Sequence, residues 1–190
     1  MAVTTLDPTS ALVLIDLQQG IAGRPTVPYT GAEVVGRAVE LAEAFRAKGL
    51  PVVLVRVTFA PDLADTVPGR TEAPRPAAAP PAGWDVIVPE LQGHEGDIHV
   101  TKRNWGAFHG TDLDLQLRRR GVTQIVLGGV ATSIGVESTA RAAHEHGYHV
   151  TVAVDAVADM DADAHANSIE KIFPRLGETG TTEEIVKLLG

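Results

Sequence analysis

Two side chains of opposite charge stand at the ends of apolar segments that are typical of buried strands. Asp16 closes the apolar run 11–16, and Lys102 ends the segment 97–102. A carboxylate beside a lysine is a familiar acid–base pair, because each group sets the charge and the pKa of the other. Each residue also has an ordinary interpretation, as an Asp that accepts a turn hydrogen bond and a Lys that is solvated.

A third feature is the turn after the strongest apolar segment, 124–130. A glycine-bearing stretch, 131–135, leads from this segment into an expected helix. Such a junction often presents a nucleophile, since the backbone N–H groups at a helix N-terminus lower a thiol pKa and hold an oxyanion. Yet the chain has no cysteine, and position 135 is glycine. Chemistry at this turn must therefore proceed without a thiol.

The order of the expected elements predicts how these features meet. Strands are expected at 11–16, 51–57, 97–102, 124–130 and 148–154. Helices are expected at 31–48, 112–120, 136–146, 161–173 and 182–189. This alternation predicts an α/β fold in which helices cover both faces of a parallel sheet. Ligands of such sheets bind outside the carboxyl ends of the strands, where Asp16, Lys102 and the 131–135 turn are expected.

Residues 1–190 are expected to form one domain, with a Pro- and Ala-rich irregular loop at 60–84. Loops of this length are often lids or contact surfaces, and a variable surface insertion is the other interpretation. Arg70 lies in this loop and could bind a substrate carboxylate through two hydrogen bonds, although an exposed loop arginine is commoner.

Composition excludes several classes of function. The net charge of −8 argues against non-specific nucleic-acid binding and against a basic membrane contact. No apolar run has the roughly 20 residues that span a bilayer, and no signal peptide is recognisable. The absence of cysteine excludes disulfides and thiolate metal sites. A cytoplasmic location is the default expectation.

Several segments, in the same order, resemble the isochorismatase-like hydrolases. They are 13–18, 102–108 with 111–113, 129–140, 147–148 and 155–156. The resemblance implies a three-layer α/β/α fold around a six-stranded parallel sheet, and a dimer or larger homo-oligomer. It also implies a non-proline cis peptide between Val130 and Ala131. The amides of Ala131 and Gly135 would then form an anion-binding hole.

In the amidases of this family an Asp, a Lys and a Cys form the catalytic triad. Their positions correspond to Asp16, Lys102 and Gly135. Because glycine cannot form a thioester, the resemblance points to the true isochorismatases, which also carry glycine there and hydrolyse an enol ether. Asp16 would be the acid, Lys102 would hold the substrate or its charge, and Gly135 would leave room. The turn residues 131–133 differ from that subgroup, so the resemblance does not identify isochorismate as the substrate.

A small metabolite is the expected substrate, and no metal or cofactor is expected. The family's nicotinamidases bind a metal through an Asp-x-His motif after the second strand, but residues 58–62 contain no histidine. The alternative hypothesis is a pseudoenzyme that binds a metabolite or a partner without turnover. A further possibility is a Cys→Gly replacement made to trap a complex, which an otherwise cysteine-free chain disfavours.

Five further residues are candidates near the site. Trp105 could pack in the core, but it resembles the aromatic that serves this family as a substrate platform and is expected to form a pocket wall. Phe108 is expected to line the pocket or pack in the core. Gln18 would point to the same side as Asp16 if the strand continued, and could orient its carboxylate. Thr132 is a candidate for substrate binding. His165 is expected to order its loop, whereas the cluster His144, His146 and His149 is expected to interact with a helix end.

Overall fold

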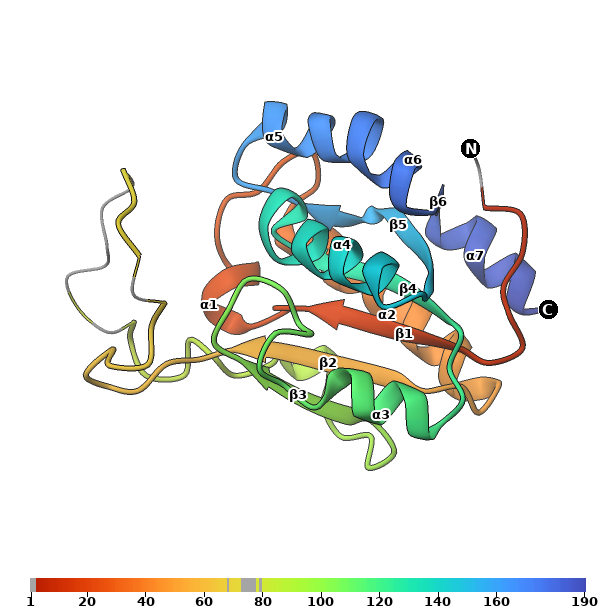
Figure 1. The fold of residues 1–190 in the computed structure, drawn as a ribbon, viewed down its shortest axis with the longest axis horizontal. Coiled ribbons are helices and arrows are strands. Elements are labelled where there is room, and N and C mark those ends of the chain that lie inside the picture. The colour runs from red at the N-terminus through yellow and green to blue at the C-terminus, as the bar shows by residue number, and fades with distance from the viewer. Residues whose placement is uncertain (1–2, 68, 73–77, 79) are drawn as a thin grey trace.

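Six parallel strands form the central sheet, in the order β3-β2-β1-β4-β5-β6 (Figure 1). The computed structural model describes residues 3–67, 69–72, 78 and 80–190. The strands are β1 (Ser10–Ile15), β2 (Val52–Val57), β3 (Ile98–Lys102), β4 (Gln124–Val130), β5 (His149–Ala158) and β6 (Glu178–Gly180). Every residue of β1 and β4 is buried, as expected for apolar runs in the middle of a parallel sheet.

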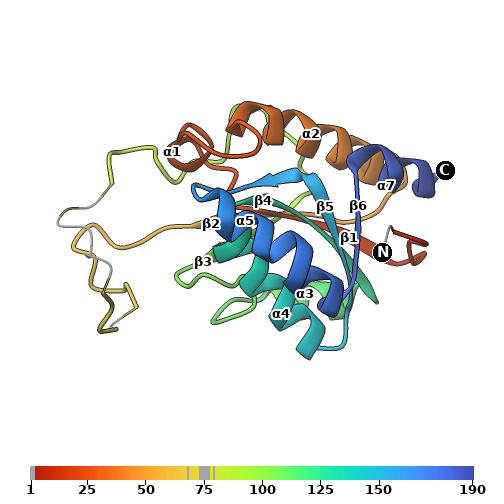
Figure 2. The ribbon, with the colours of Figure 1, turned by 90° about the horizontal axis from the view of Figure 1, so that it is seen from above.

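Helices cover both faces of the sheet, which gives the three-layer arrangement (Figure 2). One face carries α2 (Gly31–Ala47) and α7 (Thr182–Leu189). The other carries α3 (Leu113–Arg119), α4 (Glu137–Glu145), α5 (Ala162–Asn167) and α6 (Phe173–Leu176). The sheet therefore separates two hydrophobic cores, one containing Leu12 and Phe45 and the other containing Val13 and Phe173.

The expected strands and helices are present with small changes at their ends. The last strand was expected to end at 154, but β5 continues to Ala158. The expected helix 161–173 is a helical run in which α5, the π-helical η3 (Ser168–Ile172) and α6 follow one another. Three short elements were not predicted from the residues: α1 (Gln19–Ala22), the 3-10 turn η1 (Pro89–Leu91) and β6. Each has four residues or fewer, too few to produce a periodic pattern.

Register places the ends of the central strands side by side. Ile15 pairs with Val55 on β2 and with Gly129 on β4, and Val57 pairs with Lys102 on β3. The residues that follow β1, β3 and β4 therefore share the carboxyl edge of the sheet. This is the edge at which the sequence predicts the site.

The described parts of the 60–84 loop project from the molecule beyond this same edge (Figures 1 and 2). Asp65 holds the start of the loop: its carboxylate accepts hydrogen bonds from the Ala60 amide at 2.7 Å and from Arg103 Nε at 2.5 Å. The stacked rings of Phe59 and Trp84, with centroids 6.1 Å apart, join the two ends of the loop. Pro74 and Pro76 lie outside the described residues.

Among the residues that the structure describes, no helix is both long and apolar enough to cross a bilayer.

Candidate functional site

Asp16 and Lys102 form a buried ion pair across the width of β2. Lys102 Nζ donates to Asp16 Oδ2 at 2.7 Å and to the Asn104 carbonyl at 3.1 Å. The two residues are only 5% and 2% exposed. Asp16 has a φ of 52°, an uncommon conformation for a non-glycine residue, so the chain turns directly after β1. The predicted approach of these two residues is confirmed.

The environment of Asp16 favours its protonated form. Burial raises the pKa of its carboxyl from 3.8 to about 6, although the charge of Lys102 and its hydrogen bond act in the opposite direction. Asp16 Oδ1 is buried and has no hydrogen-bond partner among the described residues. A carboxyl with a pKa near neutrality and one uncommitted oxygen is suited to proton transfer.

The Gly135 turn lies against this carboxylate. The π-helical turn η2 (Thr132–Val136) joins β4 to α4, and the Val130–Ala131 peptide is cis, as expected. A Cβ placed on Gly135 would lie 3.3 Å from Asp16 Oδ2 and 2.9 Å from Ile15 Cγ2. The Cβ position of Gly135 is therefore crowded by the Ile15 side chain. That the glycine leaves room for a substrate stays a prediction.

The first residues of the turn are held from β5 and α5. Thr132 is fully buried, and its hydroxyl is 2.9 Å from His165 Nδ1. The carboxylate of Asp159 accepts a hydrogen bond from the Ser133 amide at 2.7 Å. Burial lowers the pKa of His165, and the nearby Asp159 charge opposes this effect. His165 thus orders this region, as expected, through its contact with the Thr132 hydroxyl. The role of Thr132 in substrate binding stays a prediction.

That the amide N–H groups of Ala131 and Gly135 bind an anion remains a prediction. Ala131 is 7% exposed, and its carbonyl accepts hydrogen bonds from the Ile134 and Val136 amides, both at 3.2 Å. These bonds fold the turn into one compact loop above the Asp16 carboxylate.

Gln18 does not orient Asp16. Its side-chain Nε2 donates to the Val57 carbonyl at 3.0 Å, and its Oε1 accepts from the Val57 amide at 2.7 Å. The expectation assumed that the strand continued past Asp16, but the chain turns at that residue. The fully buried Gln18 side-chain amide instead bonds the backbone of Val57, the last residue of β2, as a neighbouring strand would.

The two aromatic candidates lie in different environments. Phe108 is 8% exposed, and its ring packs 5.0 Å from His146 and 5.8 Å from Tyr148, measured between centroids. Tyr148 directly precedes β5, so Phe108 packs in the core towards the amino edge, which is the second of the two roles expected for it. Trp105 is 66% exposed. Its carbonyl oxygen would be 3.6 Å from a Cβ on Gly135, so its backbone belongs to the site while its ring faces outward.

Asp159 is a residue of this region that the sequence did not indicate. It directly follows β5, which was expected to end at 154, so its position at the carboxyl edge was not apparent. The β5 strand passes an irregularity in its pairing with β4 between Leu127 and Gly129 and then continues. Its extra residues bring Asp159 beside the turn.

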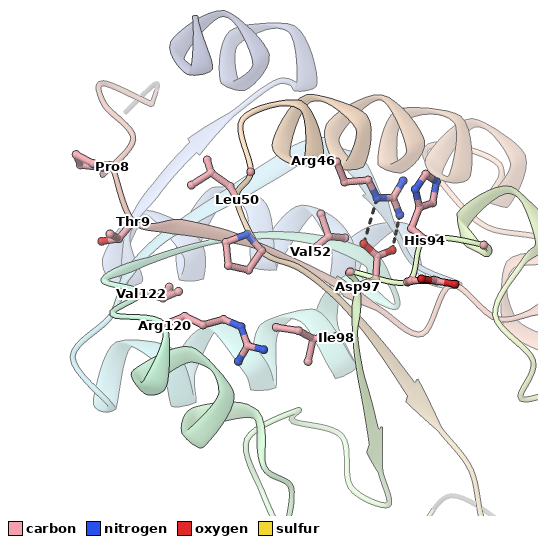
Figure 3. A pocket seen from close by; sticks show the side chains of 15 residues that line it. Pro8, Thr9, Arg46, Leu50, Val52, His94, Asp97, Ile98, Arg120 and Val122 are labelled. Atoms are coloured by element: carbon pink, nitrogen blue, oxygen red, sulfur yellow. Dashed lines mark hydrogen bonds and ion pairs between the residues drawn. The ribbon is translucent and has the colours of Figure 1, made fainter.

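A cavity lies at the opposite edge of the sheet. It has a volume of about 800 Å³ and includes Leu50, Ile98 and Val122, which precede or begin β2, β3 and β4 (Figure 3). A bidentate pair between Arg46 and Asp97 forms one wall. None of the predicted site residues lines this cavity.

In the part of the chain that the structure describes, no three or more His, Asp or Glu side chains are arranged to hold a metal ion.

Comparison with known proteins identifies the relatives of this chain. Residues 10–184 match the Isochorismatase domain model. The isochorismatase family protein YecD of Escherichia coli O157:H7 is 49% identical over 95% of this chain and 96% of its own length. YwoC of Bacillus subtilis, from the same family, is 45% identical over 94% and 93%. The structure of an isochorismatase family protein from Burkholderia thailandensis superposes with a TM-score of 0.94, at 48% identity and 97% coverage of both chains.

Proposed function

This chain belongs to the isochorismatase family of hydrolases, and we propose that it hydrolyses a small metabolite without a covalent cysteine intermediate. The observation that carries the proposal is the Asp16 carboxyl, with a pKa of about 6 and an Oδ1 that has no partner among the described residues. Gly135 stands where the amidases of the family carry their nucleophile, and the chain contains no cysteine to replace it.

The reaction that fits these groups is acid-driven hydrolysis of an enol ether. Asp16 transfers its proton to the vinyl carbon, and the π electrons of the double bond form the new C–H bond. The resulting oxocarbenium ion is attacked by water, which loses a proton to the Asp16 carboxylate. The tetrahedral adduct then collapses: the C–O bond to the former ether oxygen breaks, the hydroxyl proton passes to that oxygen, and a carbonyl product and an alcohol are released. No step requires a side-chain nucleophile.

Lys102 stabilises the carboxylate that exists after proton transfer. Its ammonium lies 2.7 Å from Asp16 Oδ2 at a site from which water is largely excluded, so the attraction is stronger than it would be in solvent. The amides of Ala131 and Gly135 would bind a negatively charged or polarised oxygen of the substrate. No metal or cofactor takes part in this scheme.

We also propose that the protein assembles as a homodimer or larger oligomer. The 66% exposed Trp105 follows the Lys102 strand, and exposed Met160 follows Asp159, so both are at the rim of the site. A second copy that covered these side chains would make Trp105 a wall of the pocket. Analytical ultracentrifugation tests this, and a strictly monomeric wild type would contradict it.

The test of function is a panel of small metabolites, including enol ethers, screened by thermal shift and then by mass spectrometry. Product formed by the wild type and not by Asp16→Asn supports the proposal. The alternative is a pseudoenzyme, favoured by the absence of a nucleophile at Gly135. A ligand that raises the melting temperature without forming any product would support that alternative.

A further inference from the structure

Thr139 connects the two loops that carry the candidate site. It is fully buried, in the first turn of α4, and its hydroxyl donates to the Gly135 carbonyl at 2.7 Å. The same oxygen accepts a hydrogen bond from the Ala107 amide at 3.0 Å. One hydroxyl thus joins the turn after β4 to the segment after Lys102.

The segment after Lys102 has no regular secondary structure of its own between 103 and 112. Its Ala107 peptide is held on both sides, because the Ala107 carbonyl accepts from Thr111 Oγ1 at 2.5 Å. The backbone also approaches α4 closely: a Cβ on Gly106 would lie 3.3 Å from the Ser138 carbonyl oxygen. The position of this segment is therefore set by its contacts with α4.

A threonine hydroxyl that donates to the carbonyl four residues earlier is a common feature inside helices and contributes little by itself. Here the acceptor is the Gly135 carbonyl, and the same Thr139 hydroxyl also accepts from the Ala107 amide. Donating to Gly135 makes the hydroxyl oxygen a better acceptor for Ala107. Hydrogen bonds in such a chain strengthen one another. Removing the hydroxyl would leave the buried Ala107 amide without this acceptor.

We propose that Thr139 is a positioning residue that sets the distance between Lys102 and Asp16 by fixing the Lys102 segment to the Gly135 turn. Lys102 Nζ is itself bonded to the Asn104 carbonyl, so a displacement of the 104–107 backbone is transmitted to the ammonium. The relevance of this role to turnover rests on the proposed function, whereas the positioning is measured on Asp16 without any substrate.

The experiment is a carboxyl titration of ¹³C-labelled Asp16 by NMR, assigned with Asp16→Asn. Because Lys102 lowers the pKa of Asp16, a loosened Lys102 gives a higher pKa. Thr139→Val should raise the pKa by half a unit or more above the wild-type value. Thr139→Ser keeps the hydroxyl, so the pKa of Asp16 in this variant should lie within a few tenths of a unit of the wild-type value. Thr151→Val removes another fully buried hydroxyl, near the amino edge, and should change nothing.

An unchanged Asp16 pKa in a folded Thr139→Val protein would overturn the proposal, as would an equal shift in Thr151→Val. Thr139→Ala gives the same reading if the valine variant does not fold. If neither folds, Thr139 is a general structural residue and the positioning role is rejected. A shifted pKa in a protein that turns over no metabolite would support the positioning role and leave the proposed function as the part that failed.

Discussion

Lys102 bonds one oxygen of the Asp16 carboxylate, at 2.7 Å, while the other oxygen has no hydrogen-bond partner among the described residues. The pair is therefore asymmetric: Oδ2 holds the electrostatic partner and Oδ1 is the oxygen that can carry and transfer a proton. Both residues are buried, and a buried oxygen without a hydrogen-bond partner destabilises the folded protein unless a ligand bonds it.

Replacing Asp16 should remove the proton donor. We expect Asp16→Asn to lower kcat for the identified substrate by about 10²–10⁴-fold, the usual contribution of a general acid, with a smaller change in KM. Steady-state kinetics measure this, and circular dichroism verifies the fold. As a matched control, Asp159→Asn alters a carboxylate that bonds the Ser133 amide and should reduce kcat far less. Turnover by Asp16→Asn at the wild-type rate would exclude the acid mechanism.

The pH profile should report the protonation of Asp16. Because the acid form is the active one and the folded pKa is about 6, kcat/KM is expected to fall as the pH rises through about 6. Lys102 lowers this pKa, so Lys102→Met should move the descending limb to higher pH while reducing the maximal rate. A limb that stayed in place in Lys102→Met would mean that another group controls the profile.

Acidification should weaken the contact between Thr132 and His165. The folded pKa of His165 lies below the ordinary value of 6.5, so the unfolded chain binds the proton more readily. The contribution of His165 to stability is therefore fully present above about pH 6.5 and is lost as the pH falls through the folded pKa.

Urea unfolding of wild type and His165→Asn at pH 8 and at pH 5 tests this. At pH 8 the variant should be less stable by about 1–2 kcal/mol, the typical effect of losing a buried hydrogen bond. At pH 5 the difference should shrink. His99→Asn alters an exposed histidine and provides the control, with no difference expected at either pH. If the difference in stability between wild type and His165→Asn were larger at pH 5 than at pH 8, the folded pKa of His165 would be raised and not lowered.

Side chains added at Gly135 should cost stability. A Cβ there meets Ile15 Cγ2 at 2.9 Å, so Gly135→Ala and Gly135→Cys should each lose about 1–3 kcal/mol of unfolding free energy. Denaturant unfolding measures this loss. Of the two, the Cys variant alone should gain hydrolysis of primary amides, since its thiol would lie beside Asp16. Amide hydrolysis by the Ala variant, or none by a folded Cys variant, would argue against a retained amidase arrangement.

The residue pattern predicted the elements that position the site. Apolar runs such as 11–16 and 124–130 are long enough to identify buried parallel strands, and the parallel topology brings their carboxyl ends together. The approach of Asp16, Lys102 and Gly135 followed from that topology. Short elements without periodicity, such as β6, produced no signal, and the end of β5 was placed too early, which concealed Asp159.

The sequence by itself determined the fold class, the edge of the sheet at which the candidate residues gather and the absence of a thiol, because hydrophobic periodicity and residue identity are local properties of the chain. Only the tertiary structure decided which groups meet: Gln18 bonds Val57, Phe108 packs near Tyr148, and Thr139 joins Gly135 to Ala107. These contacts depend on the turn at Asp16 and on how irregular loops pack against α4. Such packing joins residues far apart in the chain, and no local pattern encodes it.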